Sequence, residues 1–238
     1  MWANSGSDAL ARFATGKSDL VLNGRFEHVP LLTANDNLGV TPQIDPTPGL
    51  FGLLIVEAGP FLSNAAKRAA IPSAIDRRRL LSAFKIGTWR ESLTLAPETL
   101  RNRGEVVRPE WTSRNLQARK AAARETISGW ESANGQVRPL RIAMPGGTGA
   151  RILFAYLRAD MAAIGLEIER TGPNQPADIR FIDRVADISS PAWYLDQMSC
   201  TMTRLCSSPA DRLVAEARLT TDHEQRKQML EQAESELQ

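Results

Sequence analysis

The sequence is poor in the residues that build metal and catalytic centres. Its 238 residues include two cysteines and two histidines, and aromatic residues make up 6%. A cytosolic metal site would need more ligands than these side chains supply, so no metal site is predicted. There is no run of about 18 uncharged apolar residues, so no transmembrane helix is expected. The remaining composition, 42% hydrophobic, is typical of a folded chain with one large or two small domains.

Sequence signatures of common enzymes are also missing. The chain has no GxSxG nucleophile elbow, no HExxH zinc motif and no GxxxxGK[ST] phosphate loop. The turn MPGGTGAR at residues 144–151 precedes an expected helix and offers amides to an anion, but it lacks the lysine, which favours a plain strand-to-helix turn. Asp183 and Asp187 form an acid pair that a hydrolase could use. We predict no enzyme activity and no cofactor, and keep the hydrolase as a minor alternative.

The cysteines and the N-terminus bear on the compartment. Cys200 and Cys206 lie six residues apart. We expect a structural or free thiol pair, with a local disulfide in an oxidising compartment as the alternative. The first residues, MWANSGSDAL, lack the charged start and apolar middle of a secretory signal.

Positive charge is concentrated in the middle of the chain. Residues 67–124 carry far more lysine and arginine than aspartate and glutamate, and three arginines stand together at 77–79. This segment could bind an anion or a nucleic acid. It holds few aromatic residues for base stacking (Phe84, Trp89 and Trp111), which favours a solvated basic face.

The first half of the chain predicts helices and strands separated by irregular segments. A helix capped by Ser7 and stopped at Gly16 should lead into a strand at residues 19–23. Residues 33–49 are rich in turn formers and predict an irregular crossing. The run LFGLLIV that follows is apolar on both faces, which is typical of a central strand. In the next helix Pro72 predicts a kink or a fresh start.

The second half predicts a β-α-β unit. Residues 140–144 alternate as a strand, residues 150–164 form an amphipathic helix ended by Gly165, and a strand resumes in LEIER. A further strand is expected in ADIRFI, followed by two helices, the second beginning with Thr221 and Glu224 in the spacing of a capping box. The fold class is therefore α/β, with a sheet flanked by helices.

Several separated stretches resemble the extracytoplasmic solute-binding proteins of peptide and nickel ABC importers. Residues 8–24 resemble the helix, glycine and Asp-Leu-Val pattern that leads into that family's second lobe, and residues 140–170 resemble its strand, helix and Ile-Gly-Leu strand. Residues 50–81, 177–195 and 220–237 are similar to three further segments, in the family's order. The matching positions in these three are Pro60, Phe61, Asn64, Arg68, Ala70, Ala74, Ile75, Asp76, Arg77, Asp178, Ile179, Ala186, Asp187, Pro191, Asp222, Arg226, Ala233 and Glu234.

The resemblance implies one lobe of a two-lobed periplasmic-binding-protein fold with a mixed sheet. Residues 1–238 would form a single lobe, the second, with a loop-rich basic subsegment at 85–130, and the three arginines would lie on the outside of a helix. The function implied is non-catalytic binding of a peptide-like solute between two lobes. The partners implied are that solute, an ABC permease and the missing first lobe, with no nucleic acid. The location implied is periplasmic or lipid-anchored, with the signal outside this sequence.

Departures from the family pattern mark the residues most specific to this chain. Asp183 and Arg184 stand where the family often has tryptophan, and Glu57 stands near the end of a strand that commonly ends in asparagine. A free carboxylate or amine needs a charged partner where water is excluded. We therefore predict Arg184, Asp183 and Asp187 as polar residues of the ligand cleft, together with Trp193 and Glu57.

Overall fold

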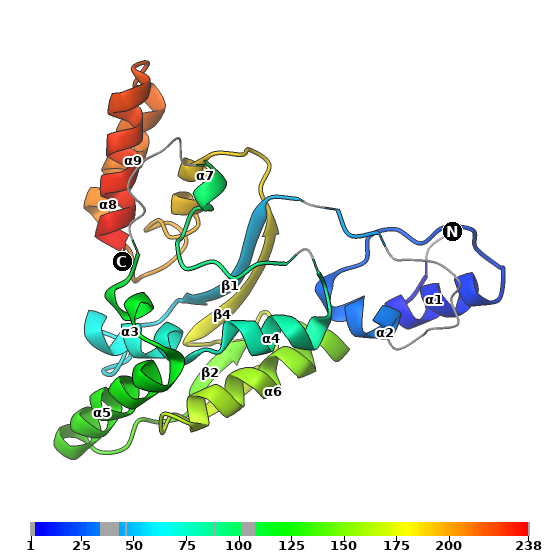
Figure 1. Ribbon diagram of the computed structural model, residues 1–238, viewed down its shortest axis with the longest axis horizontal. Helices are drawn as coiled ribbons and strands as arrows, with labels where there is room; N and C mark the ends of the chain where they lie inside the picture. Colours follow the sequence, from blue (N-terminus) through cyan, green and yellow to red (C-terminus); the bar gives the residue numbers. More distant parts are fainter. Residues whose placement is uncertain (1–2, 34–42, 46, 88, 101–107, 238) are drawn as a thin grey trace.

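The structure is a computed structural model that describes residues 3–33, 43–45, 47–87, 89–100 and 108–237 (Figure 1). It contains a mixed four-stranded sheet flanked by helices. The strands are β1 (Gly49–Ile55), β2 (Leu140–Ala143), β3 (Ile168–Thr171) and β4 (Ile179–Val185). The α-helices are α1 (Gly6–Ala14), α2 (Val29–Thr33), α3 (Ala65–Ala74), α4 (Arg77–Phe84), α5 (Leu116–Asn134), α6 (Thr148–Ala162), α7 (Pro191–Asp196), α8 (Ser208–Leu219) and α9 (His223–Leu237), and short 3-10 turns occupy η1 (Phe26–His28), η3 (Glu98–Leu100) and η4 (Glu110–Ser113).

The strand order is β1-β4-β2-β3. β2 runs parallel to β3 and to β4, so the predicted β2-α6-β3 unit is confirmed, whereas β1 pairs antiparallel with β4. The prediction that LFGLLIV forms a central strand is wrong, because β1 lies at an edge of this sheet. Most of its side chains are half-buried and only Leu54 is buried; Phe51 packs against Phe26 on one face. Thr203 donates a hydrogen bond to the carbonyl of Ile55 at the end of the strand.

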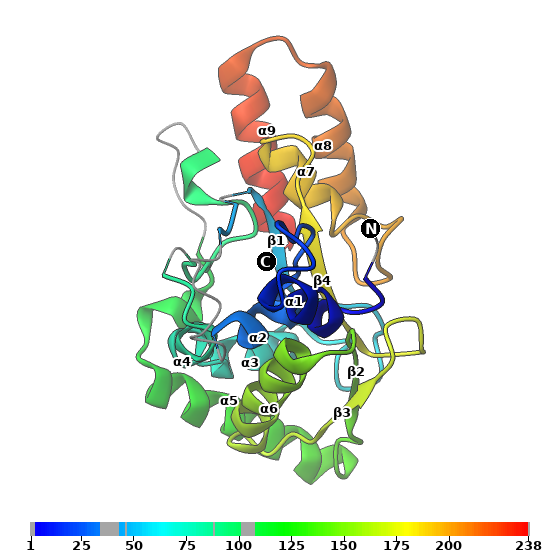
Figure 2. The same ribbon diagram turned by 90° about the vertical axis from the view of Figure 1, so that its right-hand side faces the viewer.

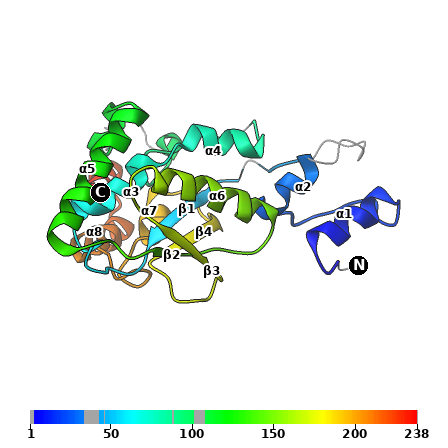
Figure 3. The same cartoon turned by 90° about the horizontal axis from the view of Figure 1, so that it is seen from below.

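The main core lies between the sheet and helices α3 to α6, which are gathered at one end of the molecule in Figures 1 and 3. It contains buried residues of α3, α4, α5, α6, β2 and η1. α6 ends as predicted near Gly165, which has a φ of +88° that favours glycine. None of the described helices is both long enough and apolar enough to cross a membrane.

Helices α8 and α9 pack against each other as a hairpin that projects from the sheet (Figure 2). A second, smaller cluster of buried side chains joins them to α7 through Leu195, Val214 and Ala233. The predicted Thr221 and Glu224 capping box does not begin α9. Instead the amide of Gln225 donates to Asp222 Oδ1 at 2.8 Å, because the helix begins one residue later than the sequence pattern indicated.

The N-terminal segment differs from its prediction in two ways. α1 is capped by Ser5, whose Oγ accepts from the Asp8 amide, and not by Ser7. Residues 19–23 form no strand, since no described strand pairs with them, and Leu20 and Leu22 are 67% and 70% exposed. Most of the predicted irregular crossing at 33–49 lies outside the described residues.

The helix with Pro72 restarts, as one of the two predicted alternatives. Pro72 lies in α3, which ends at Ala74, and α4 begins at Arg77 with Asp76 as its N-cap. The expectation that all three arginines lie outside is wrong in part. Arg78 is exposed. Burial, and then the nearby charge of Arg119, lower the pKa of Arg77 to about 10. Arg79 forms an ion pair with the buried carboxylate of Asp160.

Cys200 and Cys206 form a disulfide, so the expected thiol pair is not what the structure contains. The turn between α7 and α8 brings their Cα atoms to 4.9 Å, which is within the range that a disulfide spans. Thr203, inside this loop, anchors it to the end of β1 through its hydrogen bond to Ile55.

Candidate functional site

Asp183 and Arg184 lie near the end of β4, at the edge where the parallel strands terminate. Ligands of open α/β sheets bind outside the carboxyl ends of such strands. Side chains alternate along a strand, so these two neighbours point to opposite faces of the sheet. The pairing partners of β1 confirm the two faces: Asp183 lies opposite Phe51, and Arg184 lies opposite Leu50.

Arg184 is joined to Trp193 on one face. Its Nη1 donates to Gln197 Oε1 at 2.8 Å, and Gln197 Nε2 donates to the carbonyl of Trp193 at 3.1 Å. Gln197 is buried, whereas Arg184 is exposed. Two predicted site residues are therefore brought together through a glutamine that no sequence pattern had indicated.

Asp183 faces the other way, toward η1. Phe26 in η1 packs against Phe51 and Phe181 with ring centroids 5.2 and 4.8 Å apart, and this places the neighbouring Glu27 beside the end of β4. Desolvation and then the charge of Glu27 raise the pKa of Asp183, although the charge of Arg25 opposes this. The site therefore contains two interacting carboxylates.

Glu27 is the residue that sequence reasoning missed. It is 8% exposed, and its Oε2 has no hydrogen-bond donor among the described residues. The turn MPGGTGAR explains its position. A Cβ at Gly147 would lie 2.8 Å from Glu27 Cβ, and one at Gly149 would lie 2.5 Å from the carbonyl oxygen of Phe26. These glycines allow η1 to approach the start of α6.

The other two predicted residues lie apart from this pair. Asp187 is exposed in the segment after β4, and its side chain forms no hydrogen bond or ion pair with the described residues. Glu57 follows β1 at the opposite end of the sheet, where it forms an ion pair of 3.4 Å with Arg204. The structure thus joins Arg184 to Trp193 through Gln197, and places Asp183 on the opposite face of the same end of β4. Asp187 lies two residues beyond that end, and Glu57 lies at the other end of the sheet.

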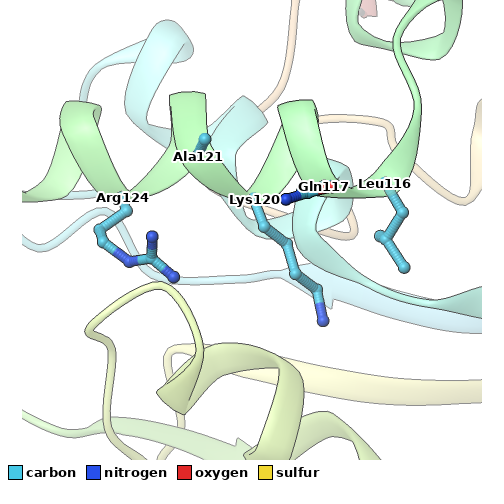
Figure 4. Close-up of a pocket in the computed structure, with 5 residues that line it drawn as sticks. All are labelled: Leu116, Gln117, Lys120, Ala121 and Arg124. Carbon is cyan, nitrogen blue, oxygen red and sulfur yellow. The ribbon is translucent and has the colours of Figure 1, made fainter.

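Two cations of the basic segment 67–124 line a cavity and are bound within the fold. A cavity of about 430 Å³ on α5 is lined by Leu116, Gln117, Lys120, Ala121 and Arg124 (Figure 4). Both of its cations bind α6: Lys120 Nζ lies 2.7 Å from Asp160 Oδ1, and Arg124 donates to the carbonyl of Ala163. These contacts account for the charges without a polyanion.

A smaller cavity of about 210 Å³ lies between the start of α7 and α9. Its lining includes Ser189 and Ser190, two and three residues after Asp187, and Glu231 of α9. Within the part of the chain that the structure describes, no three histidine, cysteine, aspartate or glutamate side chains gather in a metal-binding arrangement.

Comparison with solved structures connects this fold to known proteins. The chain is similar to NikA from Brucella suis in complex with Fe(III)-EDTA, with a TM-score of 0.78 and 14% identity over 99% of this chain and 52% of that one. It is similar to OppA from Haemophilus influenzae in complex with the peptide RPPGFSPFR, with a TM-score of 0.77 and 13% identity over 97% of this chain and 48% of that one. It is also similar to DppA from Helicobacter pylori in complex with the peptide STSA, with a TM-score of 0.71 and 17% identity over 98% and 48%.

These similarities establish the fold. No family model matches the sequence, and no curated protein matches it. The solved structures are periplasmic solute-binding proteins of the peptide and nickel type, which are two-lobed and are not enzymes, and this chain spans about half the length of each of the three. The resemblance read from the sequence is thus confirmed at the level of fold: the chain has the α/β fold of about half of such a two-lobed protein.

Proposed function

We propose that this chain is the second lobe of a solute-binding protein that serves an ABC importer. It binds a peptide-like solute between itself and a first lobe, and the closed form delivers the solute to a membrane permease. The observation that carries the proposal is the match of nearly the whole chain to half of proteins solved with bound peptides. The lobe performs no catalysis.

The ligand-contacting surface in this proposal is the rim at the end of β4. Asp183, Arg184, Asp187 and Trp193 contact the solute there, because they lie at the carboxyl edge of the sheet, where crevices in α/β folds bind ligands. Asp187 is suited to a charged group of the solute, since its carboxylate has no protein partner among the described residues. Glu57 remains a predicted contact for a solute that reaches the other end of β1.

The proposed location is the periplasm or the outer face of the cytoplasmic membrane. The disulfide supports it, because disulfides persist in oxidising compartments and are rare in the cytosol.

An amide-resolved NMR titration tests this function. The chain is titrated with a pool of short peptides and, separately, with a DNA oligonucleotide at two salt concentrations. We expect peptide-dependent shifts at residues 183–193, which Asp187→Asn weakens and Glu125→Gln, at an exposed position of α5, leaves unchanged. Shifts that are confined to residues 67–124, arise with DNA and decrease with salt would instead show a nucleic-acid-binding module.

A further inference from the structure

The rim next to Asp183 is lined by aromatic rings that remain partly open. Phe51 is 38% exposed and packs against Trp89 with ring centroids 5.2 Å apart. It also packs edge-to-face against Phe26 and Phe181, with ring centroids 5.2 and 5.0 Å apart. An aromatic surface that faces a carboxylate offers a cation both a flat apolar contact and a π face.

Glu27 is held rigidly beside these rings. The backbone of η1 approaches Gly147 and Gly149 closely, which places Glu27 Cβ beside the start of α6. Its Oε2 is buried without a protein donor. A buried carboxylate oxygen that lacks a donor costs about 1–3 kcal/mol or more, so this position is stabilised by any group that brings a positive charge and an N–H.

Asp183 is the second carboxylate of this site. Neither it nor Glu27 forms an ion pair with a described residue. The nearby cations do not neutralise the pair directly. Arg25 acts on Asp183 through its charge alone, and Arg151 and Arg170 donate to Thr148 Oγ1 and to the carbonyl of Pro145.

We propose that Glu27 and Asp183, with the rings of Phe51 and Trp89, form a subsite for a cationic group of the bound solute, an ammonium or a guanidinium. The proposal rests on the proposed function and names the class of solute: a peptide-like molecule with a positively charged side chain. The two carboxylates accept charge-assisted hydrogen bonds from the cation, and the rings cover its apolar stem.

Binding of three tripeptides that differ in one charge tests the subsite. The chain is titrated by NMR with Ala-Arg-Ala, Ala-Ala-Ala and Ala-Glu-Ala, and with methylguanidinium as a minimal cation. We expect Ala-Arg-Ala to bind about tenfold more tightly than Ala-Ala-Ala, which corresponds to about 1.4 kcal/mol, and Ala-Glu-Ala to bind more weakly than both.

Charge-removing variants identify the carboxylates responsible. Glu27→Gln and Asp183→Asn should each abolish most of the preference for arginine. The matched control is Glu125→Gln, which removes an exposed carboxylate of α5, away from the rim, and should leave the preference intact. Asp183 is exposed, so its variant keeps the test valid if the buried Glu27→Gln variant fails to fold.

The outcomes separate this inference from the proposed function. Equal binding of the three peptides, or a preference that survives both variants, would overturn the subsite while peptide binding stands. If no peptide and no methylguanidinium shifts any amide, both the subsite and the peptide-binding function are wrong.

Discussion

Asp160 in α6 is the carboxylate whose removal should weaken the fold most clearly. It is fully buried, and it receives Lys120 Nζ at 2.7 Å, Arg79 Nη2 at 3.0 Å and the amide of Asp76 at 2.9 Å. One side chain thus joins α4, α5 and α6. The change Asp160→Ala removes all three contacts and leaves two cations at the helix interface.

The loss of stability in Asp160→Ala depends on how well the two cations, Arg79 and Lys120, can be solvated by water once their partner is removed. Removing one partner of a buried ion pair costs about 3–5 kcal/mol. Here the side chains of Arg79 and Lys120 are 45% and 21% exposed and can turn partly to water, so we expect the lower end, about 3 kcal/mol. In a chain of this size, each kcal/mol lowers Tm by about 2–4 °C, which gives a decrease of about 6–12 °C.

Thermal unfolding followed by circular dichroism measures this change. The matched control is Arg78→Ala in α4, which removes a surface ion pair to Glu91 from a side chain that is 88% exposed. Its effect should stay below about 1 kcal/mol. If Asp160→Ala lowers Tm no more than Arg78→Ala does, the assignment of Asp160 as the link between the three helices is wrong.

Three further changes should alter stability in defined directions. Desolvation would raise the pKa of Asp178, but hydrogen bonds from Arg138 and from the backbone outweigh it and lower the pKa. The variant Asp178→Asn should therefore be less stable than the parent protein at neutral pH. In urea unfolding, the difference in stability should disappear as the pH falls through that lowered pKa. Replacing Cys200 and Cys206 by serine should cost about 2 kcal/mol for so short a loop, and unfolding under reducing conditions should then no longer differ between the two proteins. Asp183→Asn should raise Tm at neutral pH, because the raised pKa of Asp183 means that its charged form is disfavoured in the folded chain. The gain in Tm should vanish below the usual carboxyl pKa, and a lower Tm at neutral pH would contradict this reasoning.

Local patterns in the sequence predicted the parts of the fold that are local. The β2-α6-β3 unit, its terminal Gly165 and the restart after Pro72 depend on residues close together in the chain. The position of β1 does not. A continuous apolar run reports that both faces are covered, and it carries no information on whether one or two strands pair with it. That is why β1 was expected at the centre and lies at an edge.

The candidate site was predictable only in part, for the same reason. Asp183 and Arg184 could be selected because they stand out from the resemblance, yet alternation along β4 sends them to opposite faces. Glu27 carries no sequence signal at all. Its role depends on packing against Gly147, which lies 120 residues later in the chain by the printed numbering, and on the end of β4. Such contacts arise from topology.

The contrast among buried carboxylates supports the proposed subsite at the rim. The buried carboxylate residues of the described chain are Glu27, Asp160, Asp178 and Glu234. Asp160 and Asp178 bind cations and amides, and Glu234 accepts from the amide of Leu95. Folds satisfy buried polar groups because an unsatisfied one is costly. Glu27 alone among these four keeps an oxygen without a donor in the described chain, and it does so at the edge where α/β sheets bind ligands, beside a second carboxylate. A cationic solute would supply the missing donor, so the cost that the free chain carries at Glu27 becomes part of the affinity for that solute.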